Sequence, residues 1–291
     1  MVACSTGIRS QVSGISDTHF KGWAKPGLVP PGARAAPEVA PDETLDAISG
    51  HFRIFQLRDG HRFSTDDVLT AWYGTSWAPS PSRVLDLGSG IGSVGMIAAW
   101  RLPGARFVTI EVQEDSVRLA RKSAAYNGLD ERYEIRLGDF RTAGVLASHE
   151  QFDLVLGSPP YIPIGSGLEG DHPQKVACRF EMRGDMRDYA HVAAAHLAPG
   201  AVFACVFPEA DRRRVEDAAA GAKLTIVRRR PVVFREGEPP LIGLFAIVRS
   251  DDLPPRMQAR TWVEPPLTIR CADGSVHPEY AAVKLAVGFP P

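Results

Sequence analysis

Long apolar runs are missing from this sequence of 291 residues. A membrane-spanning helix needs about 20 apolar residues, whereas the longest uncharged apolar stretches, such as residues 201–207, have the length of a strand. The first residues also lack the positive charge and the apolar segment of a signal peptide. The sequence therefore argues against a membrane span and against export, and predicts a cytoplasmic location.

Cysteine is scarce, and charge of neither sign dominates. The cysteines form no Cys-x-x-Cys pair and the eight histidines no His-x-x-x-His pair, so neither a disulfide framework nor a metal site is predicted. Lys and Arg number 33 against 34 Asp and Glu, which excludes a uniformly basic coat for nucleic acid but leaves a local basic patch open. The four cysteines are Cys4, Cys178, Cys205 and Cys271.

The two ends of the chain differ in pattern from its centre. Residues 1–50 are rich in Gly and Pro and lack a sustained apolar period, which predicts a mostly irregular extension. The proline-rich residues 251–291 are predicted to form a tail or a small appendage. Between them, residues 51–57 predict a strand, and Ser64 predicts the start of a helix, with Asp67 at the capping-box position.

Residues 51–250 alternate short apolar runs with helical segments. This alternation predicts an α/β, Rossmann-like fold with a mostly parallel seven-stranded sheet that ends in an antiparallel hairpin. The predicted sheet strands are 83–87, 106–111, 133–137, 152–157, 201–207, 224–234 and 241–250. The predicted helices that alternate with them are 93–101, 115–127, 185–197 and 209–220.

A glycine-rich motif lies where the first strand of this sheet passes into a helix. Gly88, Ser89, Gly90 and Gly92 belong to the run Val-Leu-Asp-Leu-Gly-Ser-Gly-Ile-Gly-Ser. Glycines let the backbone turn tightly and let a ligand approach closely. Glu111 closes the next predicted strand, where a carboxylate suits the two hydroxyls of a ribose. The two elements together predict a nucleotide-like ligand.

Two details argue against a nicotinamide cofactor. The glycines follow a Gly-x-Gly-x-Gly spacing, which differs from the dinucleotide fingerprint. Asp86 stands two residues before the first glycine, where its charge repels a pyrophosphate but attracts an ammonium group. S-adenosylmethionine carries an ammonium, a ribose and an adenine but no phosphate, and it is the predicted cofactor. Asp139 and Phe140, after the third strand, suit its adenine, although alone they are more typical of a turn aspartate and a core phenylalanine.

The tetrad Ser158-Pro159-Pro160-Tyr161 follows the fourth strand. Consecutive prolines end the strand and stiffen the loop. The lone pair of an exocyclic or amide nitrogen is delocalised, so an enzyme that methylates it has to accept hydrogen bonds from both of its N–H groups. The Ser158 hydroxyl and the Pro159 carbonyl can act as these acceptors, and Tyr161 can stack on a planar substrate. The tetrad predicts N-methylation.

Residues 51–250 resemble class I S-adenosylmethionine-dependent methyltransferases with an Asn/Asp/Ser-Pro-Pro-aromatic tetrad. More narrowly, they resemble the bacterial adenine-N6 methyltransferases that modify a valine tRNA beside its anticodon. This resemblance rests on residues 60–69, 172–181 and 228–233. It implies that Ser64 and Thr65 join the glycine motif around the methionine end of the cofactor. The predicted function is therefore methylation of adenine N6 in tRNA.

The tetrad departs from that family in one residue, because Ser158 stands where Asn is usual. A leading serine is typical of cytosine-N4 DNA methyltransferases. Three alternatives therefore stay open at this point: a DNA methyltransferase, a protein glutamine-N5 methyltransferase, and a cofactor-binding RNA protein whose catalysis has decayed.

Basic residues gather in 208–235, which contains eight Arg and Lys against four Asp and Glu. In a strand, alternation places Arg228 and Arg230 on one face. We predict that these two residues, with Arg179, bind the nucleic-acid substrate. For Arg212–Arg214, a solvated face paired with neighbouring acids is an equally good interpretation.

Overall fold

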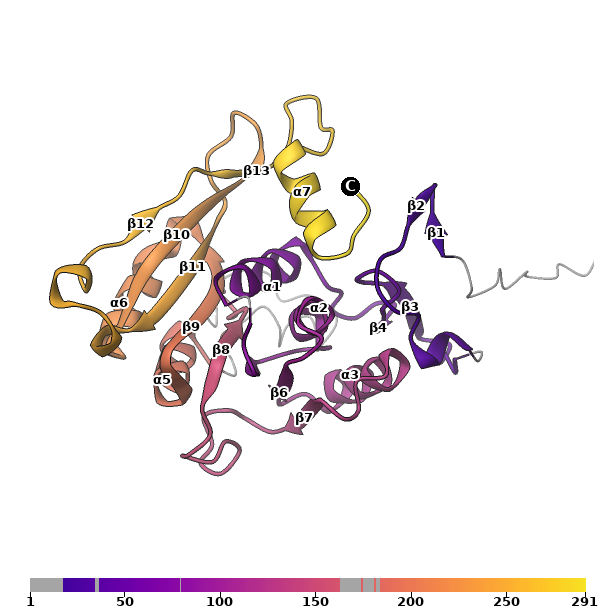
Figure 1. Cartoon of the computed structure of the whole chain (residues 1–291), viewed down its shortest axis with the longest axis horizontal. Coiled ribbons are helices and arrows are strands. Elements are labelled where there is room, and N and C mark those ends of the chain that lie inside the picture. Colours follow the sequence, from indigo (N-terminus) through magenta and orange to yellow (C-terminus); the bar gives the residue numbers. More distant parts are fainter. Residues whose placement is uncertain (1–17, 35–36, 79, 163–173, 175–180, 182–183) are drawn as a thin grey trace, which may run out of the picture.

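The computed structural model describes residues 18–34, 37–78, 80–162, 174, 181 and 184–291 (Figure 1). Among these residues, nine strands form one central sheet in the order β12-β10-β11-β9-β8-β5-β6-β7, with β13 also paired to β10. The seven strands of its core are β5 (Arg83–Leu87), β6 (Arg106–Glu111), β7 (Tyr133–Leu137), β8 (Phe152–Gly157), β9 (Leu197–Pro208), β10 (Leu224–Arg235) and β11 (Ile242–Arg249).

Strands β5 to β9 are parallel, and β11 lies antiparallel between β9 and β10. This arrangement confirms the predicted α/β fold with a mostly parallel seven-stranded sheet and a C-terminal hairpin. The C-terminal segment, predicted as a tail or a small appendage, adds to the sheet, because β12 (Trp262–Val263) and β13 (Leu267–Arg270) pair with β10. The short helix α7 (Pro278–Ala286) then packs against α1 (Figure 1).

Helices cover both faces of the sheet. Val84 packs in a core with residues of α2 and α3, whereas its neighbours Leu85 and Leu87 pack with residues of α5 and α6. The period of two in β5 therefore divides its side chains between two apolar layers. The helices are α1 (Thr65–Trp77), α2 (Ser93–Arg101), α3 (Glu114–Asn127), α5 (Met186–His196) and α6 (Arg212–Gly221).

The N-terminal extension is more ordered than the sequence predicts. Strand β3 (Glu43–Ala47) pairs antiparallel with β4 (Arg53–Leu57) in a separate two-stranded sheet. The fully buried Glu43 fixes β3 to α3, because it accepts hydrogen bonds from Arg118 and Lys122. The rest of the described extension holds only short elements, namely β1 (His19–Phe20), β2 (Trp23–Ala24) and the 3-10 turn Pro31–Arg34.

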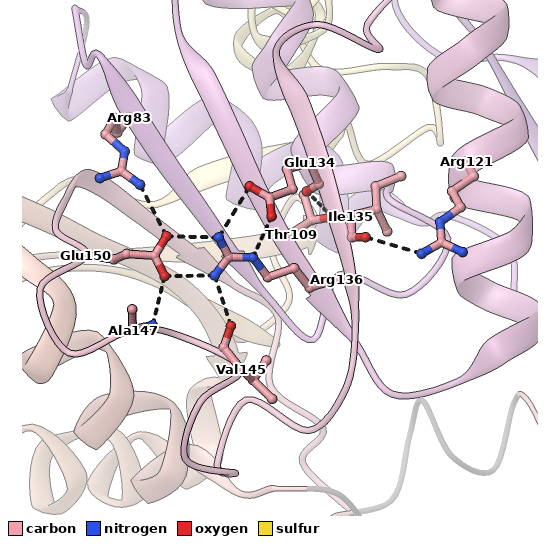
Figure 2. Close-up of polar contacts among 9 residues, drawn as sticks. All are labelled: Arg83, Thr109, Arg121, Glu134, Ile135, Arg136, Val145, Ala147 and Glu150. Carbon is pink, nitrogen blue, oxygen red and sulfur yellow. Dashed lines mark hydrogen bonds and ion pairs between the residues drawn. The ribbon is translucent and has the colours of Figure 1, made fainter.

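The loop between β7 and β8 is held by one carboxylate (Figure 2). Glu150 forms two hydrogen bonds of 2.8 and 2.9 Å with the Arg136 guanidinium, and it also accepts from the backbone N–H of Ala147. Arg83 at the start of β5 approaches the same carboxylate at 3.4 Å. This network fixes the loop at the amino end of β8.

Within the described part of the chain, no helix is long and apolar enough to span a bilayer.

Candidate functional site

The loops at the carboxyl ends of β8, β5, β6 and β7 surround one cavity of about 400 Å³. Leu87 is paired with both Gly157 and Ile110, and Glu111 is paired with Leu137. The four predicted motifs, each of which follows one of these strands, are therefore neighbours. This edge, where the strand order reverses between β5 and β8, is where open α/β sheets bind ligands.

The glycine motif forms one wall of the cavity. Gly88 and Gly90 have φ angles of +60° and +54°, which favour glycine. A Cβ added to Gly88 would collide with the Tyr189 hydroxyl, whereas a Cβ added to Gly90 would meet no atom within 4 Å. Gly90 therefore leaves open space for a ligand. Gly92 is the N-cap of α2 and does not line the cavity, so its role is in the turn itself.

Glu111 lies at the centre of the site with only 5% of its surface exposed. One carboxylate oxygen accepts from the N–H of Gly90 at 2.9 Å, and the other accepts from the N–H of Gln113 at 2.8 Å. These bonds hold the carboxylate rigidly in the cavity wall. An ionised carboxylate has about four acceptor positions, so it can still accept two hydroxyl groups.

Asp66, Asp67 and Asp86 line the cavity together with Glu111, and none of these four carboxylates has an ion-pair partner within the described residues. Asp86 accepts from the N–H of Gly95 at 3.0 Å, and Asp67 accepts from the N–H of Ser64 at 2.9 Å. Burial raises the pKa of Asp66 and of Asp67 to about 6. It also raises the pKa of Asp86 well above its usual value, and the charges of Asp67 and Glu111 add to this. Such a group of buried carboxylates suits a cationic ligand.

Two aromatic side chains, Phe140 and Tyr189, also line the cavity. Phe140 packs edge-to-face against Tyr189, with ring centroids 4.8 Å apart. Asp139 lines the cavity as predicted, but both of its carboxylate oxygens accept hydrogen bonds from Arg141. An adenine amine would therefore share this carboxylate with Arg141.

The tetrad lies at the cavity's rim, and all four of its residues line it. Pro159 is buried, whereas Tyr161 is 41% exposed. The backbone carbonyl of Tyr161 accepts a hydrogen bond from the Arg214 guanidinium at 3.4 Å. The centroid of the Tyr161 ring lies 6.4 Å from the centroid of the Phe207 ring. The tetrad therefore combines a stiff backbone with one ring that remains accessible to a substrate.

The two predicted substrate-binding arginines of β10, Arg228 and Arg230, lie outside this cavity. Arg228 stacks between two tryptophans, 3.6 Å from the ring centroid of Trp77 and 4.2 Å from that of Trp262. Arg230 lies over Trp72 and forms an ion pair with Glu279. They do share one face, as alternation predicts, but α1 covers that face.

The structure also shows the surroundings of other residues that were predicted to lie near the cofactor or on a basic face. Thr65 does not line the cavity. Arg212 and Arg214 pair with Glu216 and Glu181, so the interpretation as a basic face paired with neighbouring acids holds for these two. Arg179 lies outside the described residues.

Several residues that line the cavity were not predicted as site residues, among them Asp66, Asp67 and Tyr189. Asp66 and Asp67 are adjacent, and only the capping role of Asp67 was predicted. That role is present, because Ser64 and Asp67 form a capping box. Tyr189 comes from the second turn of α5, and no local pattern marks it. Only the packing of α5 beneath the glycine motif brings it to the site.

S-adenosylmethionine fits these residues. The unpaired carboxylates suit its ammonium group, Glu111 suits its ribose, and the cavity has the volume of a small-molecule site. The Ser89 hydroxyl lines the cavity and is buried without a hydrogen-bond partner among the described residues, so it can bind a ligand. No group of three or more metal-ligating side chains is found in the part of the chain that the structure describes.

Comparison with known proteins agrees with this geometry. Residues 80–174 match a family model described as a methyltransferase domain. A predicted O-methyltransferase from Agrobacterium tumefaciens superposes with a TM-score of 0.58 at 19% identity, over 77% of this chain and 98% of that one. The fold is thus that of the class I methyltransferases, and the domain and fold imply S-adenosylmethionine as the cofactor.

Curated relatives are similar over 31% to 64% of this chain. The tRNA1(Val) (adenine(37)-N6)-methyltransferase of Porphyromonas gingivalis is 31% identical over 170 residues, which cover 57% of this chain and 65% of that protein. The enzyme of the same name from Aeromonas hydrophila is 28% identical, over 64% of this chain and 76% of its own. The release factor glutamine methyltransferase of Chlorobaculum tepidum is 40% identical over 91 residues, which make up 31% of each chain.

Proposed function

We propose that this protein transfers a methyl group from S-adenosylmethionine to the exocyclic N6 amine of an adenine in tRNA. The observation that carries the proposal is the position of the tetrad. Ser158 to Tyr161 border the same cavity as the unpaired carboxylates, so a target amine and a cationic methyl donor can meet there. The relatives named as tRNA1(Val) (adenine(37)-N6)-methyltransferases support adenine in tRNA as the substrate. We place the reaction in the cytoplasm.

The cofactor supplies an electrophilic methyl group on a positively charged sulfur. The acidic wall around Asp86 binds its ammonium end, and Glu111 accepts hydrogen bonds from its ribose hydroxyls. Phe140 packs against its adenine, and Asp139 accepts from the adenine amine while it remains bonded to Arg141. These contacts orient the methyl group toward the tetrad.

The tetrad activates the target nitrogen. The Pro159 carbonyl and the Ser158 hydroxyl accept from its two N–H groups, and this turns the lone pair out of the plane of the base toward the methyl group. Ser158 suits this role because its hydroxyl makes no hydrogen bond with any other described residue. Tyr161 stacks on the base, a contact worth about 1–3 kcal/mol. An anticodon loop presents its bases largely unstacked, so little energy is needed to expose the target. Arg179 stays a proposed RNA contact.

The experiment is transfer of labelled methyl from S-adenosylmethionine into separate pools of unmodified tRNA, DNA and release factor, followed by product analysis. We expect the label in tRNA, recovered as N6-methyladenosine. Pro159→Ala and Tyr161→Ala should lower the transfer rate at least tenfold with unchanged cofactor affinity. Phe20→Ala, a control at another exposed aromatic residue, should match the unsubstituted protein.

A second candidate is methylation of a glutamine amide, and the similarity to the release factor glutamine methyltransferase favours it. An amide nitrogen needs the same two acceptors. Label in the release factor alone would establish this alternative, and label in DNA alone would establish a DNA methyltransferase. Cofactor binding with no transfer to any pool would contradict the proposed activity and support a decayed enzyme.

A further inference from the structure

The loop of the tetrad needs outside groups to hold its end in place. Pro159 and Pro160 have no backbone N–H, so this part of the loop cannot donate hydrogen bonds to its neighbours. Its position therefore depends on groups that donate to its carbonyls or pack against its side chains. The need is greatest at Tyr161, because its ring is accessible at the cavity rim and has to lie in a set place for a planar substrate to stack on it.

A guanidinium from α6 supplies such a donor. Arg214, in the first turn of α6, donates to the backbone carbonyl of Tyr161 at 3.4 Å. The same guanidinium lies over the ring of Phe207, 5.2 Å from its centroid. The Tyr161 ring meets Phe207 edge-on, at an interplanar angle of 79°. Phe207 lies near the end of β9 and is buried in the core, so Arg214 and Tyr161 share one rigid platform.

Glu181 holds Arg214 in this position. Its carboxylate is mostly buried and forms an ion pair with the Arg214 guanidinium. The backbone N–H of Glu181 donates to the carbonyl of Ile162 at 3.0 Å. The two members of one ion pair therefore bind the carbonyls of two successive residues, Tyr161 and Ile162. Arginine suits this bridge, because its planar guanidinium carries five donors and keeps its charge.

We propose that Arg214 is a positioning residue for Tyr161, and that its pair with Glu181 fixes the aromatic end of the tetrad at the cavity rim. Arg214 does not line the cavity, so it acts on the substrate through Tyr161. The stacking face is then in place before the substrate arrives, and binding spends no free energy on ordering the loop. This inference rests on the proposed function, because it takes Tyr161 as the stacking residue, but it holds for any planar acceptor.

The test measures methyl transfer into whichever of the three pools, tRNA, DNA or release factor, accepts the label. Arg214→Ala should lower kcat about tenfold, as expected for the loss of a hydrogen bond from a charged group, with unchanged affinity for S-adenosylmethionine. Arg214→Lys keeps the charge but not the fork of donors, so it should recover only part of the rate. Glu181→Gln leaves the bond to Tyr161 and should lower kcat about threefold. Arg213→Ala, at an exposed position of the same helix, is the matched control and should retain the normal rate.

A double variant separates positioning from a general effect on the fold. If Arg214 acts through the Tyr161 ring, adding Arg214→Ala to Tyr161→Ala should cause no further loss of rate. Losses that multiply in the double variant would overturn the proposal and leave Arg214 a purely structural residue. An unchanged kcat in Arg214→Ala would overturn it as well.

Fluorine NMR of protein labelled with 3-fluorotyrosine gives a readout that needs no acceptor. The Tyr161 resonance is identified as the one that Tyr161→Phe removes. In Arg214→Ala it should move toward its position in the unfolded protein, because the ring leaves Phe207, whereas Arg213→Ala should leave it in place. A resonance that stays in place in Arg214→Ala would overturn the proposal. A failure of the proposed function is seen separately, as absence of label in tRNA with the unsubstituted protein.

Discussion

Buried carboxylates occur in two regions of this molecule, and their surroundings differ sharply. In the scaffold, Glu43 is bonded to Arg118 and Lys122, and Glu150 is bonded to Arg136 (Figure 2). In the cavity wall, the carboxylates of Asp66, Asp67 and Asp86 accept hydrogen bonds or lie free, but none of them pairs with a described cation.

The pKa values of the two sets differ in the same way. Burial alone would raise the pKa of Glu43, but hydrogen bonds from Lys122 and Arg118 lower it to about 2. The Arg136 guanidinium lowers the pKa of Glu150 to about 2. Burial instead raises the pKa of Asp66 and of Asp67 to about 6. The scaffold carboxylates thus have their cations within the fold, whereas Asp66, Asp67 and Asp86 have no cation partner among the described residues, which suits a cationic ligand. This difference separates residues that stabilise the fold from residues that bind.

Asp86→Asn should have the largest effect, and it should act on binding alone. The amide keeps the size of the side chain and an acceptor for the N–H of Gly95, but it removes the charge that faces the cofactor's ammonium. Loss of one charged hydrogen bond costs about 2–3 kcal/mol, or about 30- to 150-fold in affinity for S-adenosylmethionine. Calorimetry checks the affinity. Thermal unfolding of the unliganded protein should show equal or higher stability, because a buried, unpaired charge is removed. A large loss of stability would instead mean that Asp86 stabilises the fold, as Glu43 and Glu150 do.

Glu150→Gln should have the reverse effect, on stability alone. It removes the charge that Arg136 pairs with in a site where the carboxylate is mostly buried. We expect a loss of about 2 kcal/mol in the free energy of unfolding, measured by urea denaturation, and unchanged cofactor affinity. Glu134→Gln is the matched control. Glu134 bonds the same guanidinium but is largely exposed, so its loss should cost at most about 0.5 kcal/mol. Weaker cofactor binding in Glu150→Gln would remove the distinction between the two regions.

The sequence predicted the parts of this site that local pattern encodes. The strands 83–87, 106–111, 133–137 and 152–157 have the predicted bounds, and glycine marks the end of three of them, at Gly88, Gly138 and Gly157. Motifs that follow parallel strands come together at one sheet edge, so Gly88, Gly90, Glu111, Asp139 and the tetrad line one cavity.

What the sequence could not predict depends on packing between distant segments. Arg228 and Arg230 were correctly placed on one face of a strand, but nothing local indicates that tryptophans of α1 cover that face. Tyr189 likewise lacks a motif, since its place at the cavity depends on where α5 packs. The extension strands β12 and β13 were missed because two- and four-residue strands carry too little periodicity.

The smallest expected effect is the pH dependence of stability and of cofactor affinity. It is also the sharpest test of the comparison between the scaffold carboxylates and those of the cavity wall. Glu43 and Glu150 have pKa values lowered from 4.5 to about 2, so the stability they contribute is complete above pH 4.5 and is lost as the pH falls toward 2. Asp66 and Asp67 have pKa values raised from 3.8 to about 6, so the unliganded protein loses stability as the pH rises from 3.8 through 6. Over that interval the cavity gains the negative charge that binds a cation.

Affinity for S-adenosylmethionine should therefore fall by up to about tenfold between pH 7.5 and pH 5, because a carboxyl with a pKa near 6 is only about one-tenth ionised at pH 5. The fold is intact over this range, since the scaffold carboxylates titrate lower. The ligand cannot cause the loss, because its α-amino group, with a pKa near 8, only becomes more fully charged at low pH. Calorimetry at pH 7.5, 6 and 5 measures the trend. An affinity that is constant over this range would mean that the cofactor's cation is bound by other groups than Asp66 and Asp67.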